Sequence, residues 1–420
     1  MKFVVKNTEK FIYYFIIALP IIDIFTALTV NFPLSTGAII RTSIMFILMM
    51  FIIKQSFLFH KSYLVLFFIS TSSITITIIC NYLFKEPFYL FSEIQFYLKT
   101  MYFIVMIFTV LILLSKKIVS YGILQATEWA AIILGISYWI AILTNTNLQS
   151  YAYDKHGFSG WFFSANELSV IVLILLSLVV CQFHKNKSIR SLLANILLLS
   201  MTPMIGTKTA FYGGFIIFFT YIIFLLFKEK IQKQTVTLIS VALLYILLLP
   251  MTPVAINESF NFTFIENISQ SKENGSINEL LSSRDIYLED TKNDYINAIF
   301  IRKLFGLGYA GDYEVSPKTI EMDLYDLFFS YGIIGTISLL IPVMIIAYQL
   351  IKFNTSITYI LLFLTCGLCA GVSFVAGHVI FAPSVMTYMA ILFIATYLAT
   401  EEGISNNNEK RFSHDNRAYF

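Results

Sequence analysis

Long hydrophobic segments separated by short polar connections make up most of this chain. Read with a window of about 19 residues, they predict about twelve spans, centred near positions 20, 45, 73, 105, 132, 173, 198, 218, 242, 337, 365 and 389. Each segment is close to the ~20 residues that an α-helix needs to cross the hydrocarbon core of a bilayer. The pattern therefore predicts an all-α, polytopic membrane protein.

One long polar segment, from Thr252 to Asp323, interrupts this pattern between the ninth and tenth spans. Its first part, 257–283, is rich in Asn, Ser and Glu and is typical of a mobile surface loop. From Arg284 to Leu304, apolar residues recur at near-helical spacing, which predicts a helix with one apolar face on the membrane surface. The glycines of the string 306–311 are expected to end this helix in a flexible turn.

The chain is accordingly divided into four parts. Residues 1–252 form a membrane domain with the first nine spans, and residues 253–322 form an extracytoplasmic loop that is partly helical. Residues 323–400 form a membrane domain with the last three spans, and residues 401–420 form a cytoplasmic tail. Lys and Arg are concentrated before the first span and in every second short connection. Because basic loops stay in the cytoplasm during insertion, both termini are expected there and the long loop outside.

Composition narrows the class of protein further. Apolar residues make up 58% of the chain and charged residues 13%, whereas charged residues are about 25% of a typical soluble domain. The net charge of +3 comes mostly from the connections predicted to be cytoplasmic, so it gives no sign of nucleic-acid binding. The four cysteines all lie in predicted spans, so no disulfide is expected in the outer loop.

Charged residues within or against the membrane are candidates for function, because each costs ~2.5–3.5 kcal/mol near the centre of a span. Asp23 in the first span and Arg41 in the second are expected to form a structural ion pair. Lys208 lies in an outward-facing turn between two threonines, where it can bind an anion or extend along the membrane edge. His378, at the outer end of the eleventh and twelfth spans, is a further candidate.

The long loop and its return into the membrane carry a second group of candidates. Arg284 can offer two parallel N–H donors to a phosphate, or form a surface salt bridge with a nearby carboxylate. Glu321, Asp323 and Asp326 enter the tenth span, and positions 323 and 326 share a helical face. A partly desolvated carboxylate there can act as a general base on a hydroxyl, or cap the helix N-terminus.

The stretch before the sixth span combines aromatic residues with a polar pair. Trp161 is interpreted as an interfacial anchor, with a sugar-stacking platform as the alternative. Asn166 and Glu167 begin the sixth span, and they can contact a substrate or cap the helix. Both interpretations stay open on the sequence alone.

Taken in order, five of these stretches resemble the O-antigen ligase and polymerase superfamily of bacterial membrane enzymes. They are Phe158 to Leu168, Gly206 to Ala210, Ser283 with Arg284, Phe305 to Gly308, and Glu321 to Gly335. The resemblance covers most of the chain and is clearest from about residue 150 onward. Two positions depart from the family pattern. Thr207-Lys208-Thr209 stands where many members have Ser-Arg-Thr, and Glu321-Met322 stands where ligases have a His-Asn pair.

The resemblance implies a polyprenyl-diphosphate-dependent glycosyltransferase of the bacterial cytoplasmic membrane that works on its outer face without metal or cofactor. The acidic version of the motif is similar to that of polymerases. This favours polymerisation of undecaprenyl-diphosphate-linked repeat units into a surface polysaccharide of the O-antigen, capsule or teichuronic type. Transfer of glycan to a final acceptor by a ligase is the alternative within the family. A polysaccharide flippase or other transporter is the alternative from another class.

Under this interpretation, the partners are the lipid-linked oligosaccharide, the growing glycan acceptor, the lipid bilayer, and flippase and chain-length regulator proteins, but no nucleic acid. The expected residues fall into three sets: Glu321 and Asp323 as catalytic carboxylates, Arg284, Lys208 and Arg302 around the diphosphate, and Asn166 and Trp161 at the glycan or acceptor.

Overall fold

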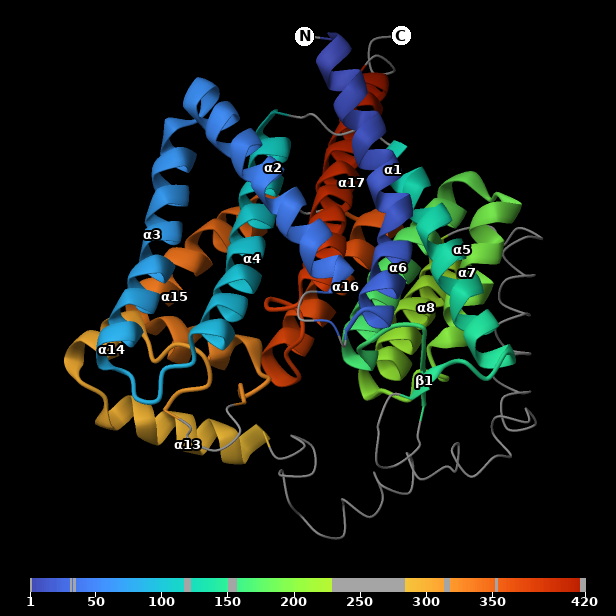
Figure 1. Cartoon of the computed structure of the whole chain (residues 1–420). Helices are drawn as coiled ribbons and strands as arrows, with labels where there is room; N and C mark the ends of the chain where they lie inside the picture. Colours follow the sequence, from blue (N-terminus) through green and yellow to red (C-terminus); the bar gives the residue numbers. More distant parts are fainter. Residues whose placement is uncertain are drawn as a thin grey trace.

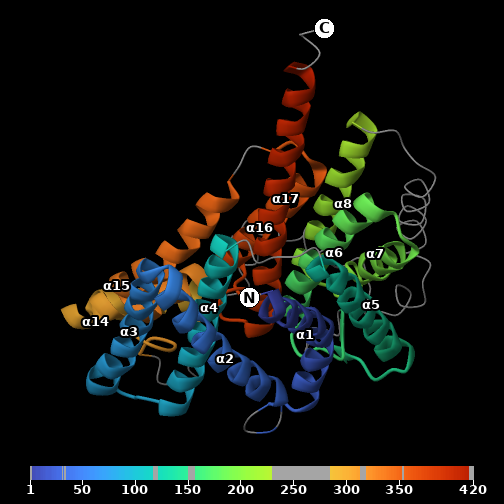
Figure 2. The same cartoon turned by 90° about the horizontal axis from the view of Figure 1, so that it is seen from above.

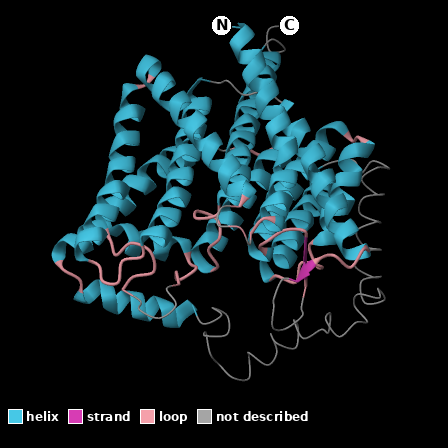
Figure 3. Ribbon diagram, viewed as in Figure 1, coloured by secondary structure: helices cyan, strands magenta, loops and turns pink. Residues whose placement is uncertain are grey.

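The computed structural model describes residues 2–30, 32, 35–116, 122–149, 157–228, 284–312, 318–351 and 354–415. Almost all regular structure in these ranges is helical (Figures 1 and 3). The helices are α1 (Lys2–Leu28), α2 (Thr36–Phe59), α3 (Lys61–Phe84), α4 (Leu90–Lys116), α5 (Gly122–Leu143), α6 (Ala165–Asn186), α7 (Ile189–Met201), α8 (Lys208–Lys228), α13 (Arg284–Asn297), α14 (Phe300–Phe305), α15 (Asp323–Leu350), α16 (Ile357–Val375) and α17 (Pro383–Asp415). Two short antiparallel strands, β1 (Leu148–Gln149) and β2 (Phe158–Gly160), pair before α6.

Within the described residues, nine helices are long and apolar enough to cross a membrane. Shorter apolar helices cover Ile12–Leu28 and Ile189–Met201, so eleven of the predicted segments coincide with a helix. The predicted all-α polytopic class is therefore confirmed. The segment centred near position 242 and the polar stretch 257–283 lie outside the described residues. The total of about twelve spans and the four-part division stay predictions.

The core of the bundle is formed by the helices that are apolar on every side. In α6 the run from Leu168 to Phe183 is buried without a break, and in α4 the run from Met101 to Leu114 is buried likewise. A helix that is hydrophobic all round is stable only where other helices or lipid surround it. On α2, by contrast, Phe46, Ile47 and Met50 are exposed, as expected of a helix whose outer face meets lipid.

The two ends of the bundle differ. The first turn of α1 and the last turn of α17 lie at one end, and α13 lies across the opposite end, where β1 also lies but on the other side of the bundle (Figure 1). We call this opposite end the α13 end. Seen from above, α17 stands between α3, α4 and α15 on one side and α5 to α8 on the other (Figure 2). The loop between α16 and α17 therefore reaches the α13 end between two groups of helices.

The predicted helix in Arg284 to Leu304 is present, but it is divided into α13 and α14. Its apolar side is directed in part to protein, because Tyr287, Leu288 and Tyr295 pack against a small cluster that includes Phe329 of α15. The glycine string ends α14 as predicted, since Gly306 is its C-cap residue and has φ of 90°.

The glycine string that follows α14 packs against a break in α15. Gly332 has φ of 62° and interrupts the helix, so carbonyl groups of the preceding turn lose their usual donors. The loop supplies the missing donors. Leu307 N donates to Phe329 O at 2.8 Å, and Gly308 N donates to Ser330 O at 3.1 Å. The glycine string is thus bound to α15 through main-chain hydrogen bonds.

A proline in the same helix is compensated by a neighbouring helix. Pro342 cannot donate to the carbonyl of Ser338, four residues earlier. Ser70 Oγ of α3 donates to that carbonyl at 2.8 Å instead. This matters in a bilayer, where no water is present to satisfy a free backbone group. The contact fixes α3 beside α15 and so places the elements that carry the site.

Candidate functional site

Glu321 lies in the turn before α15, beside three side chains that can carry positive charge. Arg284 Nη2 is 3.5 Å from Oε2, Lys318 Nζ is 3.3 Å from Oε1, and His378 Nε2 is 3.9 Å from Oε2. They come from the start of α13, from the segment before α15 and from the loop between α16 and α17. We call these four residues the Glu321 cluster. It assembles at the α13 end from three separate segments.

The backbone at this cluster is strained. Glu321 and His378 both have φ of 63°, in the left-handed region, which costs about 1–2 kcal/mol for an L-residue with a side chain. Gly377 has φ of 65°, and a Cβ atom there would lie 2.5 Å from the carbonyl oxygen of Glu321. The two loops therefore touch through their main chains. Strain of this kind persists where the surrounding structure enforces it, and it is concentrated at functional sites.

Asp323, at the start of α15, binds the loop between α16 and α17 and so holds it beside the turn that carries Glu321. Its Oδ2 atom accepts hydrogen bonds from Ser373 Oγ at 2.9 Å, from Val379 N at 2.8 Å and from Ile380 N at 2.9 Å. The residue is only 2% exposed. Of the two roles that the sequence left open, these contacts match neither directly, because Asp323 binds the loop before α17 rather than the first turn of its own helix. They favour a structural role for Asp323, and its assignment as a catalytic carboxylate stays a prediction.

Asp326 shapes the turn that carries Glu321. Its two carboxylate oxygens accept hydrogen bonds from Ile320 N at 2.9 Å and Met322 N at 3.2 Å. Asp326 thus binds the turn that precedes α15, and it is buried like Asp323. The Glu321 side chain is 29% exposed. Among the three predicted carboxylates, Glu321 is the one that a substrate can reach.

Arg284 and Lys318, the two basic side chains nearest Glu321, both depend on α13 for their positions. Arg284 and Tyr287 are three residues apart and share one face of this helix. Arg284 donates to Glu321, and its Nε is buried without a hydrogen-bond partner among the described residues. Lys318 Nζ lies 5.1 Å from the centre of the Tyr287 ring, a cation–π distance. Sequence reasoning missed Lys318, although its spacing of three residues before Glu321 was a usable signal.

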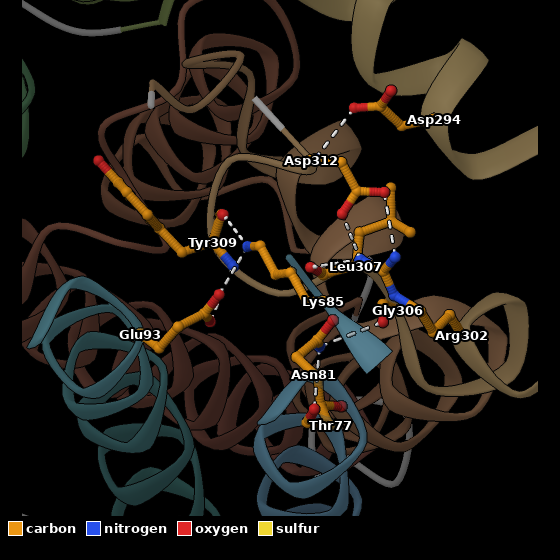
Figure 4. Close-up of polar contacts among 10 residues, drawn as sticks. All are labelled: Thr77, Asn81, Lys85, Glu93, Asp294, Arg302, Gly306, Leu307, Tyr309 and Asp312. Atoms are coloured by element: carbon orange, nitrogen blue, oxygen red, sulfur yellow. Dashed lines mark hydrogen bonds and ion pairs between the residues drawn. The ribbon is translucent and has the colours of Figure 1, made fainter. Parts of the chain in front are cut away.

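Arg302 belongs to a different network, which holds the glycine string (Figure 4). Its guanidinium forms two hydrogen bonds with the Asp312 carboxylate, at 3.0 and 2.6 Å, and a third with Leu307 O at 3.4 Å. Arg302 is 6% exposed. These contacts engage both terminal nitrogens of Arg302, which was predicted to bind a diphosphate, and they favour a structural role.

A second buried ion pair supports the same loop from α3 and α4. Lys85 Nζ lies 2.7 Å from Glu93 Oε1 and donates to Tyr309 O at 2.6 Å, while Tyr309 N donates to Glu93 Oε2 at 2.9 Å (Figure 4). Burial lowers the pKa of Lys85, and the charge of Glu93 opposes that shift. Asn81 Nδ2 donates to Gly306 O at 3.3 Å. The loop is therefore bound on the side of α3 and α4 as well as on the side of α15.

We expect an Arg302→Ala variant to lose stability rather than substrate affinity. The change leaves the partly buried Asp312 carboxylate without its partner, which costs about 1–3 kcal/mol. Thermal unfolding of the purified protein in detergent measures the effect, with Lys303→Ala on the same helix as the matched control. A variant as stable as this control, but unable to bind a lipid diphosphate, would return Arg302 to the predicted binding set.

Trp161, Asn166 and Lys208 form a second group at the α13 end, on the side of α5 to α8. Lys208 is exposed at the start of α8, and Asn166 is half-buried at the start of α6. Trp161 Nε1 donates to Thr146 Oγ1 at 2.8 Å. Strand β2 joins these segments, because Phe158 N donates to Met204 O at 2.9 Å, just before the turn that carries Lys208. In the described part of the chain, no hydrogen bond or ion pair joins any of the three to the Glu321 cluster.

The start of α17 connects the two groups. Ser384, the second residue of α17, donates a hydrogen bond to Glu167 of α6. A few residues earlier, the same segment is bound to Asp323 through Val379 and Ile380. The cap of α6 is Ser164, whose Oγ accepts from Glu167 N at 3.3 Å. The side chains of Asn166 and Glu167 therefore do not serve as the helix cap.

The predicted ion pair between Asp23 and Arg41 is confirmed. Arg41 Nη2 donates to Asp23 Oδ1, and both side chains are buried between α1 and α2. Arg41 Nη1 also donates to Thr26 Oγ1 at 3.5 Å. In the described ranges, no group of three or more His, Cys, Asp or Glu side chains is arranged to hold a metal ion.

Comparison with protein families finds one whose model matches most of the chain. The model describes an O-antigen ligase-like membrane protein, and it matches residues 5–279 and 272–401. The second match contains Arg284, Lys318, Glu321 and His378. Comparisons with curated proteins and with solved structures find no match.

Proposed function

Because the chain belongs to the family of O-antigen ligase-like membrane proteins, we propose that it polymerises undecaprenyl-diphosphate-linked repeat units into a bacterial surface polysaccharide. Membership makes the chain a membrane glycan ligase or polymerase that acts on a lipid-linked glycan. The finer assignment to polymerisation rests on Glu321-Met322, which stands where the ligases of the family have a His-Asn pair.

The Glu321 cluster is the observation that carries the proposal. Arg284 and Lys318 approach different oxygens of one carboxylate, at 3.5 and 3.3 Å. Two cations spaced to hold two oxygens of an anion also suit a phosphate group. We therefore propose Arg284 and Lys318 as the residues that bind the diphosphate. Because Arg302 is bound to Asp312, it is left out of this set, and Lys208 is proposed to contact the substrate from the second group.

The chemistry needs a base and a stabilised leaving group. The acceptor hydroxyl attacks the anomeric carbon, the bond between that carbon and the diphosphate oxygen breaks, and a new glycosidic bond forms. Glu321 takes the proton of the hydroxyl as a general base. Arg284 and Lys318 stabilise the negative charge that develops on the departing lipid diphosphate. Asp323 holds the loops in place and does not itself take part.

The second group fits the glycan or acceptor side of the reaction. Trp161 offers an aromatic surface and Asn166 an amide, and both lie at the same end of the bundle as Glu321. The hydrogen bond from Ser384 to Glu167 links their segment to the Glu321 cluster through the start of α17. We propose that the acceptor glycan lies across the α13 end between the two groups. Flippase and chain-length regulator proteins are proposed as partners in the same assembly.

The position of the cluster favours this proposal over a transporter. Transporters gather their polar groups near the middle of the bilayer, where irregular helices meet. The Glu321 cluster lies at the end of the bundle, before the first residue of α15 and after the last residue of α16. This end is predicted to face outward, where a lipid-linked glycan is presented to its acceptor.

The deciding experiment analyses the surface and lipid-linked glycans of a strain that lacks this protein, beside the same strain complemented with the intact gene. We expect single repeat units to accumulate on the lipid carrier at the outer face. Long chains on the carrier would instead identify a ligase. Single units confined to the cytoplasmic face would show a flippase and would contradict the proposal.

A further inference from the structure

His378 is placed against Glu321 by a part of the chain remote from it in sequence. Its Nε2 atom is buried, has no hydrogen-bond partner among the described residues, and lies 3.9 Å from Glu321 Oε2. The side chain as a whole is 26% exposed. Burying a ring nitrogen without a hydrogen-bond partner costs free energy of folding. An imidazole whose only role was to fill space would therefore destabilise the protein here.

The surrounding structure enforces this placement. His378 has φ of 63°, and the next two residues, Val379 and Ile380, donate their main-chain N–H groups to Asp323. On the other side, Gly377 packs against the main chain of Glu321 so closely that a Cβ atom would not fit. The strained residue is thus held between two fixed points, and its ring stays directed at the Glu321 carboxylate.

Binding of a diphosphate changes what surrounds Glu321. In the structure the carboxylate is held by Arg284 and Lys318 as well as facing His378. A diphosphate carries more negative charge than a carboxylate, so it competes for the same two cations. Once they bind the substrate, His378 is the remaining member of the cluster that faces Glu321. The charged groups around the imidazole are then Glu321 in the turn before α15 and Asp323 at its start.

On the basis of the proposed function, we propose that His378 is the positioning partner of Glu321 during glycan transfer. After the diphosphate has taken Arg284 and Lys318, His378 holds the carboxylate in place by donating Nε2–H to Oε2. The acceptor proton passes from the hydroxyl to Glu321 and from there to water, which restores the carboxylate for the next addition.

A His378→Asn variant tests this role, because asparagine tolerates the left-handed backbone better than most residues. The assay uses the purified full-length protein in liposomes, with lipid-linked repeat units extracted from the deletion strain. We expect kcat to fall by about tenfold to a hundredfold, because the base is no longer held toward the acceptor hydroxyl, with KM changed less than about twofold. His60→Asn, between α2 and α3 and far from Glu321 in the bundle, is the matched control.

A double variant distinguishes a partner of Glu321 from a residue that only supports the fold. Residues that act as a unit give non-additive losses, so His378→Asn combined with Glu321→Gln is expected to be no slower than Glu321→Gln alone. Glycine adopts positive φ freely, so His378→Gly keeps the loop conformation, and added imidazole is expected to restore part of its rate.

The outcomes separate the two proposals. An intact protein that forms no product from lipid-linked units in this assay contradicts the proposed function. If the intact protein is active, an unchanged kcat in both His378→Asn and His378→Gly overturns the role of His378. It is also overturned by a loss confined to KM, or by losses that multiply in the double variant.

Discussion

An Arg284→Ala variant is expected to reach the membrane at the normal level and to form no polymer. Arg284 is the first residue of α13 and donates to Glu321 from a largely buried position. Removal of a group that stabilises developing negative charge costs about 10²–10³-fold in rate, and here the substrate also loses a binding contact. The measurement is the length distribution of surface glycan in cells, together with the rate of product formation in liposomes.

Lys292→Ala is the matched control for this prediction. Lys292 lies on the same helix, is exposed, and its replacement removes the same charge. We expect this control to form polymer normally, because a solvated lysine on the helix contributes little to the site. Full-length polymer in the Arg284→Ala variant would eliminate Arg284 as a diphosphate-binding residue.

The second large effect is expected for Glu321→Gln. Loss of a general base lowers kcat by about 10²–10⁴-fold, whereas glutamine keeps the size and much of the hydrogen bonding of the side chain. The left-handed backbone at position 321 is equally strained for both residues, so the change isolates the charge. Product formation in liposomes gives kcat, and binding of undecaprenyl diphosphate to the purified protein gives the affinity.

The affinity of the Glu321→Gln variant for undecaprenyl diphosphate is not expected to fall with its kcat. In the intact protein the Glu321 carboxylate occupies Arg284 and Lys318, so it competes with the diphosphate. Neutral glutamine competes less, and the variant is expected to bind undecaprenyl diphosphate at least as tightly as the intact protein. Glu289→Gln, an exposed position on α13, is the control. Weaker binding combined with an unchanged kcat would contradict the proposed role of Glu321.

Arg284→Ala and Glu321→Gln are expected to have different effects, which distinguish the residue that binds the diphosphate from the general base. Arg284→Ala is expected to weaken binding and rate together, because the guanidinium contacts the substrate before and during transfer. Glu321→Gln is expected to lower only the rate. A transporter would show no such division, since neither residue would then meet a reacting bond.

The sequence by itself determined the class of the protein and much of its local structure. The segments that it predicted to span the membrane, the ion pair between Asp23 and Arg41 and the helical stretch from Arg284 were found where the structure describes the chain. Hydrophobic periodicity and the cost of charge in a bilayer are properties of short segments, so they can be read without knowledge of the fold. The expected family was also confirmed.

Only the tertiary structure decided which polar residues meet. It brought Lys318 and His378 to Glu321, bound Arg302 to Asp312, and buried Asp323 beneath the loop before α17. The sequence assigned Arg302 to the diphosphate and Asp323 to catalysis because both are charged residues near the membrane, and these assignments stay predictions. Whether such a charge is free or neutralised depends on partners from distant segments. Those partners are set by the packing of α13, α15 and α17 at one end of the bundle, which no local pattern encodes.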